Sequence, residues 1–346
     1  MEAVLDRSHG VLAAYRRRLQ QRRLSLLLLF AGAGLLGAYA VSRGAYVIPL
    51  KDLLGAFMGG PVQIDHASWV VLTRIRLPRI LAALICGWGL SVSGLGIQSL
   101  LRNPLGSPST LGISQGAAFG AALAIVVFGA GVAQVSLCAF AGAMTAALVI
   151  LAMARLRRLS PEAIILVGVA LSSLFASATI LIQFLASETE LAMVVFWTFG
   201  DVARSSWGEL GLLSAAVLLA TFILVRLRWD LNALALGEKA AGGLGVSVAA
   251  VRLSGILIAA LVAALATAFH GVIAFVGLIG PHMARGLVGD DHRLLIPFSA
   301  VIGALLLLAA DTLGRLALGS GALPVGVLTS FLGAPMFLYL LVRGYR

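Results

Sequence analysis

Apolar stretches long enough to cross a bilayer alternate with short polar segments along almost the whole chain. A helix of about 20 apolar residues spans the hydrocarbon core, and ten such stretches stand out. They cover residues 24–42, 79–101, 112–129, 132–154, 162–186, 208–226, 248–270, 273–288, 293–312 and 325–342. The pattern predicts an all-α polytopic membrane protein with ten transmembrane helices, so that both termini lie on one side.

One polar segment, residues 229–247 (WDLNALALGEKAAGGLGVS), is too polar to span and too regular to be a plain connector. It contains two short helical patterns, 232–236 and 238–244, separated by Gly237. Gly245 can close the second by adopting a left-handed cap. Two interpretations stay open: a docking surface on the face of the protein, or an amphipathic helix that lies among lipid headgroups.

Composition agrees with a membrane protein, since 60% of the residues are hydrophobic and only 11% are charged, with a mean hydropathy of +1.04. Soluble domains carry roughly twice that share of charge. Cys86 and Cys138 both fall inside apolar stretches, which favours small buried side chains over a disulfide framework or a metal site. The net charge of +11 is therefore interpreted as a topology signal, and no nucleic-acid partner is expected.

The distribution of positive charge predicts the orientation. With the N-terminus inside, 18 Lys/Arg side chains, among them Arg158 and Arg346, face the cytoplasm. The other 7, among them Lys51, face outward. This bias favours cytoplasmic N- and C-termini and places residues 229–247 in the cytoplasm. Residues 1–23 are predicted to form a retained basic tail, because no signal-peptide pattern precedes the first stretch. A single transmembrane domain, residues 24–346, follows.

The chain shows no energy source of its own. Glu162 begins one predicted span and Asp311 ends another, and no acidic residue lies near the middle of any span. Ion-coupled carriers usually need such carboxylates or broken helices. The only lysines, Lys51 and Lys239, do not belong to a phosphate-binding loop. If ATP drives transport, the ATPase is therefore a separate chain, and residues 229–247 are the candidate docking site.

Arginines crowd the outward segment TRIRLPRI, at Arg74, Arg76 and Arg79. Pro78 there predicts the start of a helix, and cations at a helix N-terminus face the positive end of its dipole. An anionic partner is expected, either lipid phosphate or an acidic protein surface. Arg315 follows Asp311 at i+4 spacing, which also allows a local salt bridge.

Several stretches together resemble one family. They are RIRLPR (74–79), SGLGIQSLLRNPLGSPSTLGISQGA (93–117), LNALALGEKAAGGLG (231–245), GVIAFVGLIGPHMARGLVGDDHRLLIP (271–297) and LPVGVLTSFLGAPMFLYLL (323–341). From about residue 24 to the C-terminus the chain is similar to FecCD/BtuC-like permeases, the transmembrane subunits of iron-chelate, haem and cobalamin ATP-binding-cassette (ABC) importers. The resemblance implies the BtuC-like type II fold, a homodimer of two permease copies and an inner-membrane location in a bacterium or archaeon. It also implies two ATPase subunits, which hold the ATP and magnesium, and a periplasmic or lipid-anchored substrate-binding protein.

The resemblance also implies roles for particular residues, although none catalytic and none in holding a metal or cofactor. The outer arginines Arg76, Arg79 and Arg315 match positions that receive acidic residues of the binding protein. The helices that seat in the ATPase match 231–245, with candidate contacts at Leu234, Leu236, Gly237, Glu238, Ala241, Leu244 and Gly245. In the fifth predicted span, the polar side chains are candidates to line the pathway: Ser172, Ser173, Ser177 and Gln183. Alternatively, these hydroxyls bond the backbone of their own helix.

The leading functional hypothesis is therefore the permease of an importer for an iron chelate such as a ferric siderophore. A cobalamin or haem importer of the same family is the first alternative, and a secondary carrier that works without an ATPase is the second. His270, His282 and His292 lie near predicted helix ends without metal-site spacing, which favours structural roles.

Overall fold

The computed structural model describes residues 2–43, 65–129, 131–157, 160–317 and 323–343, in which all regular secondary structure is helical. The first half contains α1 (Glu2–Ser42), α3 (His66–Val70), η1 (Val71–Arg76), α4 (Leu77–Leu100), α5 (Ile113–Leu123), η2 (Ala124–Phe128), α6 (Val132–Arg157) and α7 (Pro161–Leu185). The second half contains α8 (Glu188–Thr198), η3 (Val202–Arg204), α9 (Trp207–Arg226), α10 (Arg228–Ala235), α11 (Glu238–Gly243), α12 (Val248–His270), α13 (Val276–Val288), α14 (His292–Ala317) and α15 (Val325–Arg343).

Within the described residues, seven helical segments are long and apolar enough to cross a membrane. They are Leu19–Ser42, His66–Leu100, Val132–Leu156, Pro161–Leu185, Trp207–Arg226, Val248–His270 and His292–Ala317. The remaining three predicted stretches coincide with shorter apolar helices, namely Ile113–Phe128, Val325–Tyr339 and the 13-residue α13. The all-helical polytopic membrane fold is thus confirmed, whereas the number of ten crossings depends on these shorter helices and stays a prediction.

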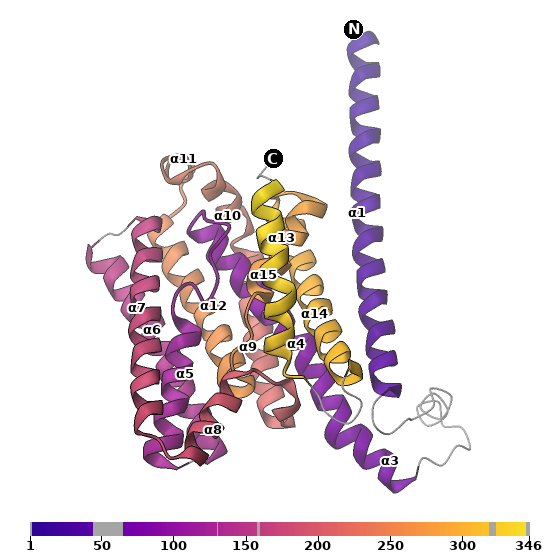
Figure 1. Ribbon diagram of the computed structural model, residues 1–346. Helices are drawn as coiled ribbons and strands as arrows, with labels where there is room; N and C mark the ends of the chain where they lie inside the picture. Colours follow the sequence, from indigo (N-terminus) through magenta and orange to yellow (C-terminus); the bar gives the residue numbers. More distant parts are fainter. Residues whose placement is uncertain (1, 44–64, 130, 158–159, 318–322, 344–346) are drawn as a thin grey trace.

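The two ends of the bundle differ in what they carry (Figure 1). One end, called here the α10 end, holds α10, α11, the start of α1 and the end of α15. The opposite α3 end holds α3 and α8. Helix α1 is continuous from Glu2 to Ser42, so residues 2–23 of the predicted basic tail are helical and run directly into the first span. Of the charges used to predict orientation, Lys51, Arg158 and Arg346 lie outside the described residues.

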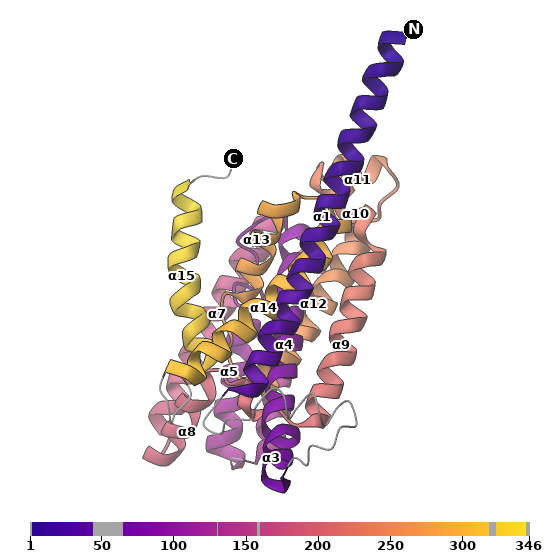
Figure 2. The same ribbon diagram turned by 90° about the vertical axis from the view of Figure 1, so that its right-hand side faces the viewer.

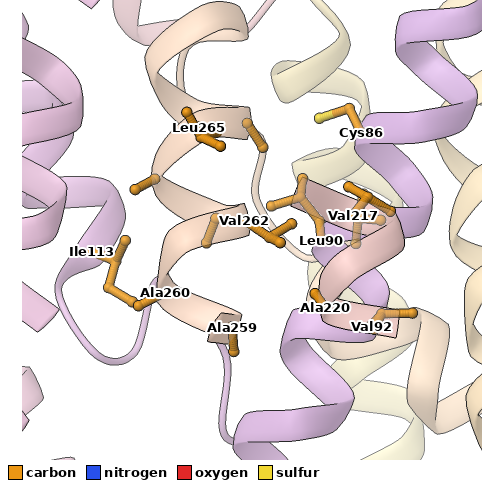
Figure 3. Close-up of a cluster of buried hydrophobic side chains, with 14 of the residues drawn as sticks. Cys86, Leu90, Val92, Ile113, Val217, Ala220, Ala259, Ala260, Val262 and Leu265 are labelled. Carbon is orange, nitrogen blue, oxygen red and sulfur yellow. The ribbon is translucent and has the colours of Figure 1, made fainter. Parts of the chain in front are cut away.

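Helix α4 is the centre of the bundle, and it packs against α14, α12, α13 and α9. Figure 3 shows Cys86, Leu90 and Val92 of α4 beside Val217 of α9 and Val262 of α12. Small and branched side chains predominate in this core. They let helices approach closely, which matters because lipid provides no hydrophobic drive for helix association. Cys86 is fully buried, as predicted, and Cys138 is partly buried.

Glycines set the distance between α4 and α14. The backbones at Gly87 of α4 and Gly303 of α14 touch, so that a Cβ atom at either position would collide with the backbone of the other helix. Gly94 makes a similar backbone contact with Gly277 of α13. At the midpoint of the same surface, the hydroxyl of Ser91 donates to the carbonyl of Ser299 at 2.7 Å. Helices α4, α13 and α14 lie next to one another in both views (Figures 1 and 2).

The helices extend past two predicted boundaries. Helix α4 begins at Leu77 with Pro78 in its first turn, as predicted, but this is not a free helix end. The helical course starts at His66, where the Asp65 side chain accepts from the N–H of Ser68, and continues through η1 into α4. The π-helical turn η1 lies directly before the proline, whose missing N–H interrupts the regular ladder. Helix α14 likewise continues past Asp311 to Ala317. The outer arginines therefore lie within helices, and not at the positive end of a dipole.

The glycine contact gives a first prediction. Gly87→Ala forces α4 away from α14, and overpacking of this kind costs about 1–3 kcal/mol, so the thermal melting midpoint of the purified protein should fall. Gly37→Ala is the matched control, because nothing lies within 4 Å of the Cβ it would add. Equal melting midpoints for the two variants would contradict the close contact.

Candidate functional sites at the two ends of the bundle

The α10–α11 pair at the α10 end has the predicted form. Helix α10 ends before Gly237, whose φ of +115° favours glycine, and α11 ends before Gly245 at φ +85°. The N–H of Val246 donates to the carbonyl of Ala241 and the N–H of Gly245 to that of Gly242, both at 3.0 Å. This is the double hydrogen bond of a glycine-closed helix end. The prediction of two short helices separated by a glycine is confirmed.

The apolar side of the α10–α11 pair is buried against the bundle. Leu231 and Leu234 of α10 and Ala241 of α11 are almost fully buried. Of the residues predicted to contact an ATPase, Leu234 and Ala241 are therefore anchors, while Leu236 and Leu244 are 72% and 68% exposed. Because protein already covers the buried face, the geometry favours a docking surface over an amphipathic helix in the headgroups.

Polar contacts fix α10 to the start of α14. The Asn232 amide nitrogen donates to Asp291 Oδ1 at 3.1 Å, and its oxygen accepts from the backbone N–H of His292 at 3.0 Å. Hydrogen bonds from the Arg293 side chain, and then from its backbone and from Asn232, lower the pKa of Asp291 to about 2. The carboxylate is therefore ionised at any physiological pH and is a constant acceptor.

Further contacts complete both anchors. The guanidinium of Arg293 lies 5.1 Å from the ring centre of Trp229, a second link between α14 and α10. Helix α11 is attached to a different span, because Glu238 forms an ion pair with Arg252 of α12. Glu238 is thus a partly exposed candidate contact that also holds α11 in place. Its position at the predicted turn did not indicate this second role.

At the α3 end, the outer arginines converge on one carboxylate. Arg79 of α4 contacts Asp311 of α14 at 2.8 Å, and Arg315 contacts the same carboxylate at 3.1 Å. Asp201 lies 3.9 Å from Arg79. Arg76 donates to the carbonyl of Val41 at the end of α1, next to these pairs. The predicted i+4 pair of Asp311 and Arg315 is confirmed, but it is buried and shared with Arg79.

Burial changes what these arginines can do. The side chains of Arg79 and Arg315 are 12% and 11% exposed, Asp311 is fully buried, and Arg76 is 5% exposed. In contrast, Arg74 is exposed. The structure therefore brings the three predicted docking residues together, but inside the protein and paired within it. The i+4 spacing revealed Arg315, whereas no sequence signal pointed to Asp201 or to the carbonyls of α1.

The pathway candidates lie on α7, at the edge of the bundle (Figure 1). Ser172 donates to the carbonyl of Gly168 in its own helix at 2.8 Å, as the alternative interpretation predicts. Ser173 and Ser177 are exposed, and Gln183 is partly buried. Most of α7 is unburied in this single chain, which leaves its outward face free for lipid or a second copy.

The histidines near helix ends make hydrogen bonds inside the protein. His270 contacts Ser205 at 2.9 Å and His292 contacts Ser99 at 2.7 Å. Among the described residues, no group of three or more His, Cys, Asp and Glu side chains is placed to hold a metal ion.

This polytopic helical bundle, with two short glycine-capped helices at the α10 end, is of the class of permease subunits of ABC importers, in which separate subunits hydrolyse ATP. Residues 28–343 match the model of the FecCD transport family, and the chain belongs to that family. It is a multi-pass protein of the inner membrane that works with ATPase and substrate-binding partners.

Relatives and a solved structure agree. A permease protein of Methanocaldococcus jannaschii, named for ABC transporters, is 47% identical over 321 residues, covering 89% of this chain and 91% of that protein. The hemin transport permease of Yersinia pestis is 35% identical, with 93% and 96% coverage. A metal-chelate type ABC transporter solved in an inward-facing conformation superposes with a TM-score of 0.83 at 33% identity, covering 93% of this chain and all of that one. Other relatives are named for molybdate, vitamin B12, iron(3+) dicitrate and iron(3+)-hydroxamate.

The buried cluster at the α3 end gives a second prediction. Asp311→Asn leaves two guanidinium groups buried without their shared partner, and breaking such a pair costs about 3–5 kcal/mol. Arg315→Met should cost much less, because it leaves one arginine against one carboxylate. Thermal melting of the purified variants compares them. If Arg315→Met were the more damaging change, Asp311 would not be the centre of the cluster.

Proposed function

We propose that this permease moves an iron chelate, such as a ferric siderophore, across the inner membrane as one half of a homodimer. The relatives named for iron(3+) dicitrate and iron(3+)-hydroxamate support the substrate class, as does the metal-chelate type transporter with the same fold. Haem and cobalamin are the alternatives, because relatives named for hemin and vitamin B12 have similar identity. Transport without an ATPase is not proposed, since the chain belongs to an ATP-driven family.

The observation that carries the proposal is the α10–α11 pair. Its buried residues attach it firmly to the bundle, while Leu236 and Leu244 point away from it. An ATPase that closes on ATP must move helices through a folded contact rather than through a flexible loop. We therefore assign the exposed part of the pair, with Gly237, Glu238 and Gly245, as the ATPase seat. The α10 end is then cytoplasmic, in agreement with the charge bias.

The remaining assignments follow from this orientation. With both termini at the cytoplasmic end, the number of crossings is even, and the three shorter helices make it ten. The outward face of α7 is where the second copy would complete a pathway, and the exposed hydroxyls of Ser173 and Ser177 lie on that helix. An uncharged surface suits passage of a bulky chelate, because it offers no strong binding site along the way.

The α3 end is then the docking surface for the binding protein. Two arginines share Asp311, with Asp201 farther away, and Arg76 and exposed Arg74 lie close by. In this cluster Arg76, Arg79 and Arg315 outnumber Asp201 and Asp311, and the local excess of positive charge would attract acidic residues of the binding protein. The buried arginines Arg76, Arg79 and Arg315 would contribute to docking through the electrostatic field and the shape of the cluster. Arg74 is exposed and would contact the binding protein directly. Complementary charges of this kind steer docking and set its orientation.

The substrate assignment is tested by uptake. The permease is reconstituted in proteoliposomes with its ATPase and its binding protein, and ATP-dependent accumulation of a ferric siderophore, hemin and cobalamin is measured in parallel. Accumulation of the siderophore alone supports the proposal. Preferential accumulation of hemin or cobalamin would assign the chain to that substrate instead.

The ATPase seat gives a third prediction. Leu236→Asp with Leu244→Asp places two charges on the exposed apolar surface that the ATPase would cover, and residues at the energetic centre of an interface contribute about 2 kcal/mol or more. The amount of ATPase that co-purifies should therefore fall at least about tenfold. Leu191→Asp is the control, because Leu191 is also an exposed leucine on a short helix, α8, but at the opposite end. Undiminished co-purification of the ATPase with the double variant would refute the assignment.

The docking surface gives a fourth prediction. Arg74→Glu should weaken the affinity of the binding protein by roughly fivefold at low salt, since exposed ion pairs contribute up to about 1 kcal/mol. The difference from the unaltered protein should shrink as salt rises, because salt screens exposed charges. Arg155→Glu reverses an exposed arginine of α6 near the other end and should leave the affinity unchanged. A salt-independent affinity, measured by titration in nanodiscs, would exclude electrostatic docking.

A further inference from the structure

Polar contacts tie α4 to α14 along the whole height of the bundle. At the α10 end, the Ser99 hydroxyl lies 2.7 Å from His292 Nε2. Near the middle, Ser91 bonds the carbonyl of Ser299 at 2.7 Å, close to the contact of Gly87 with Gly303. At the α3 end, Arg79 bonds Asp311 at 2.8 Å. Helix α4 alone rises about 36 Å at 1.5 Å per residue, which is more than the hydrocarbon thickness.

These ties oppose relative motion of the two helices. Sliding α14 by one turn along α4 would break each of the three contacts at once and leave buried polar groups without partners, which is costly away from water. The glycine contact adds a steric constraint, since the two backbones already touch. Helices α4 and α14 are thus fixed to each other at both ends and in the middle.

The tie at the α10 end continues into α10 through the ring of His292. Both the backbone N–H and the ring Nδ1 of His292 face the Asn232 oxygen, at 3.0 and 2.7 Å. The other side of the Asn232 amide faces the carboxylate of Asp291, so it must be the donating NH₂ group. Nδ1 therefore carries the proton, and in the neutral ring Nε2 accepts from Ser99. Every polar atom in this series has a partner, and the series of hydrogen bonds has only one consistent assignment of donors and acceptors.

We infer that α4 and α14 form one rigid column, and that Asn232 and His292 are positioning residues that couple movement of α10 to this column. When the ATPase shifts α10, the column would carry the movement through the membrane to the cluster around Asp311, below the surface where the binding protein docks. This inference rests on the proposed ATPase seat. Helix α11 is held instead by Arg252 of α12, so the two short helices act on different spans.

Coupling between the two ends can be measured as a binding ratio. The affinity of the binding protein for the complete transporter in nanodiscs is measured with and without a non-hydrolysable ATP analogue. The ratio of the two dissociation constants is the coupling factor. It reports a difference in binding free energy between the nucleotide-free and nucleotide-bound transporter, and it does not depend on the rate of transport. Substitutions along a coupling network change such factors by roughly 2-fold to 30-fold.

Ser99→Ala removes the bond that ties α4 to the ring of His292 at the start of α14, and Asn232→Ala removes the bonds that tie His292 to α10. Each should lower the coupling factor several-fold, with the ATPase still bound. The double variant should be no worse than the more severe single variant, because both lie on one series of contacts. Ser99→Thr keeps a hydroxyl and should restore the factor. Ser254→Ala, which removes a hydroxyl bonded only to its own helix, should have no effect.

The outcomes separate the inference from the function on which it rests. A normal coupling factor in Ser99→Ala, a strictly additive double variant or a factor of one in the unaltered transporter would each overturn the column. Loss of the ATPase from the complex is a different result, which is measured by co-purification. It would concern the proposed ATPase seat on α10 and α11 and not the column. If Ser99→Ala lowers the melting midpoint strongly, Ser91→Ala tests the same column at its middle, with the same expected loss of coupling.

Discussion

The direct backbone contact between α4 and α14 is the constraint on which the rest of this structure depends. In a bilayer, apolar side chains gain little by leaving lipid for protein, so helices associate through close packing and polar contacts. Gly87 and Gly303 provide the first, and the contacts at Ser91, Ser99 and Arg79 provide the second. The start of α14 then receives α10, and its far part carries Asp311. Both candidate docking sites are thus positioned by the same pair of helices.

Charge is handled differently at the two ends. At the α10 end, the ion pairs and the hydrogen bonds of Asn232 lie at the rim, where Glu238, Asp290 and Asp291 each have an arginine beside them. At the α3 end, two arginines and a carboxylate are buried, with a second carboxylate at 3.9 Å. A buried pair is costly unless its geometry is good. The buried cluster therefore holds α1, α4 and α14 together in one arrangement.

The pattern of apolar residues in the sequence is sufficient to predict the apolar helices, because length and hydropathy decide which segments enter a bilayer. Glycine positions were sufficient for α10 and α11, since Gly237 and Gly245 occupy backbone conformations that other residues disfavour. Pro78 lies in the first turn of α4, as predicted, but the π-helical turn that ends just before it and joins α4 to α3 has no pattern in the sequence.

Long-range pairing was the part that could not be predicted. Arg79 and Asp311 are 232 positions apart, and Asn232 and Asp291 are 59 apart. Their contacts depend on which helices become neighbours, and neither spacing nor hydropathy encodes this. For the same reason, sequence reasoning treated Arg79 and Arg315 as outward-facing charges and Leu234 and Ala241 as surface contacts. Only the packing of α14 and of the α10–α11 pair reveals that all four are covered.

The glycine-closed geometry of the α10–α11 pair has a thermodynamic consequence for assembly. Because its backbone hydrogen bonds and its anchors are already made in the single chain, an ATPase would meet a surface that needs no ordering on association. Free energy that a disordered loop would lose as conformational entropy stays available for affinity. Subunits of such a complex can then exchange or reassemble quickly, without a folding step limiting how fast they meet.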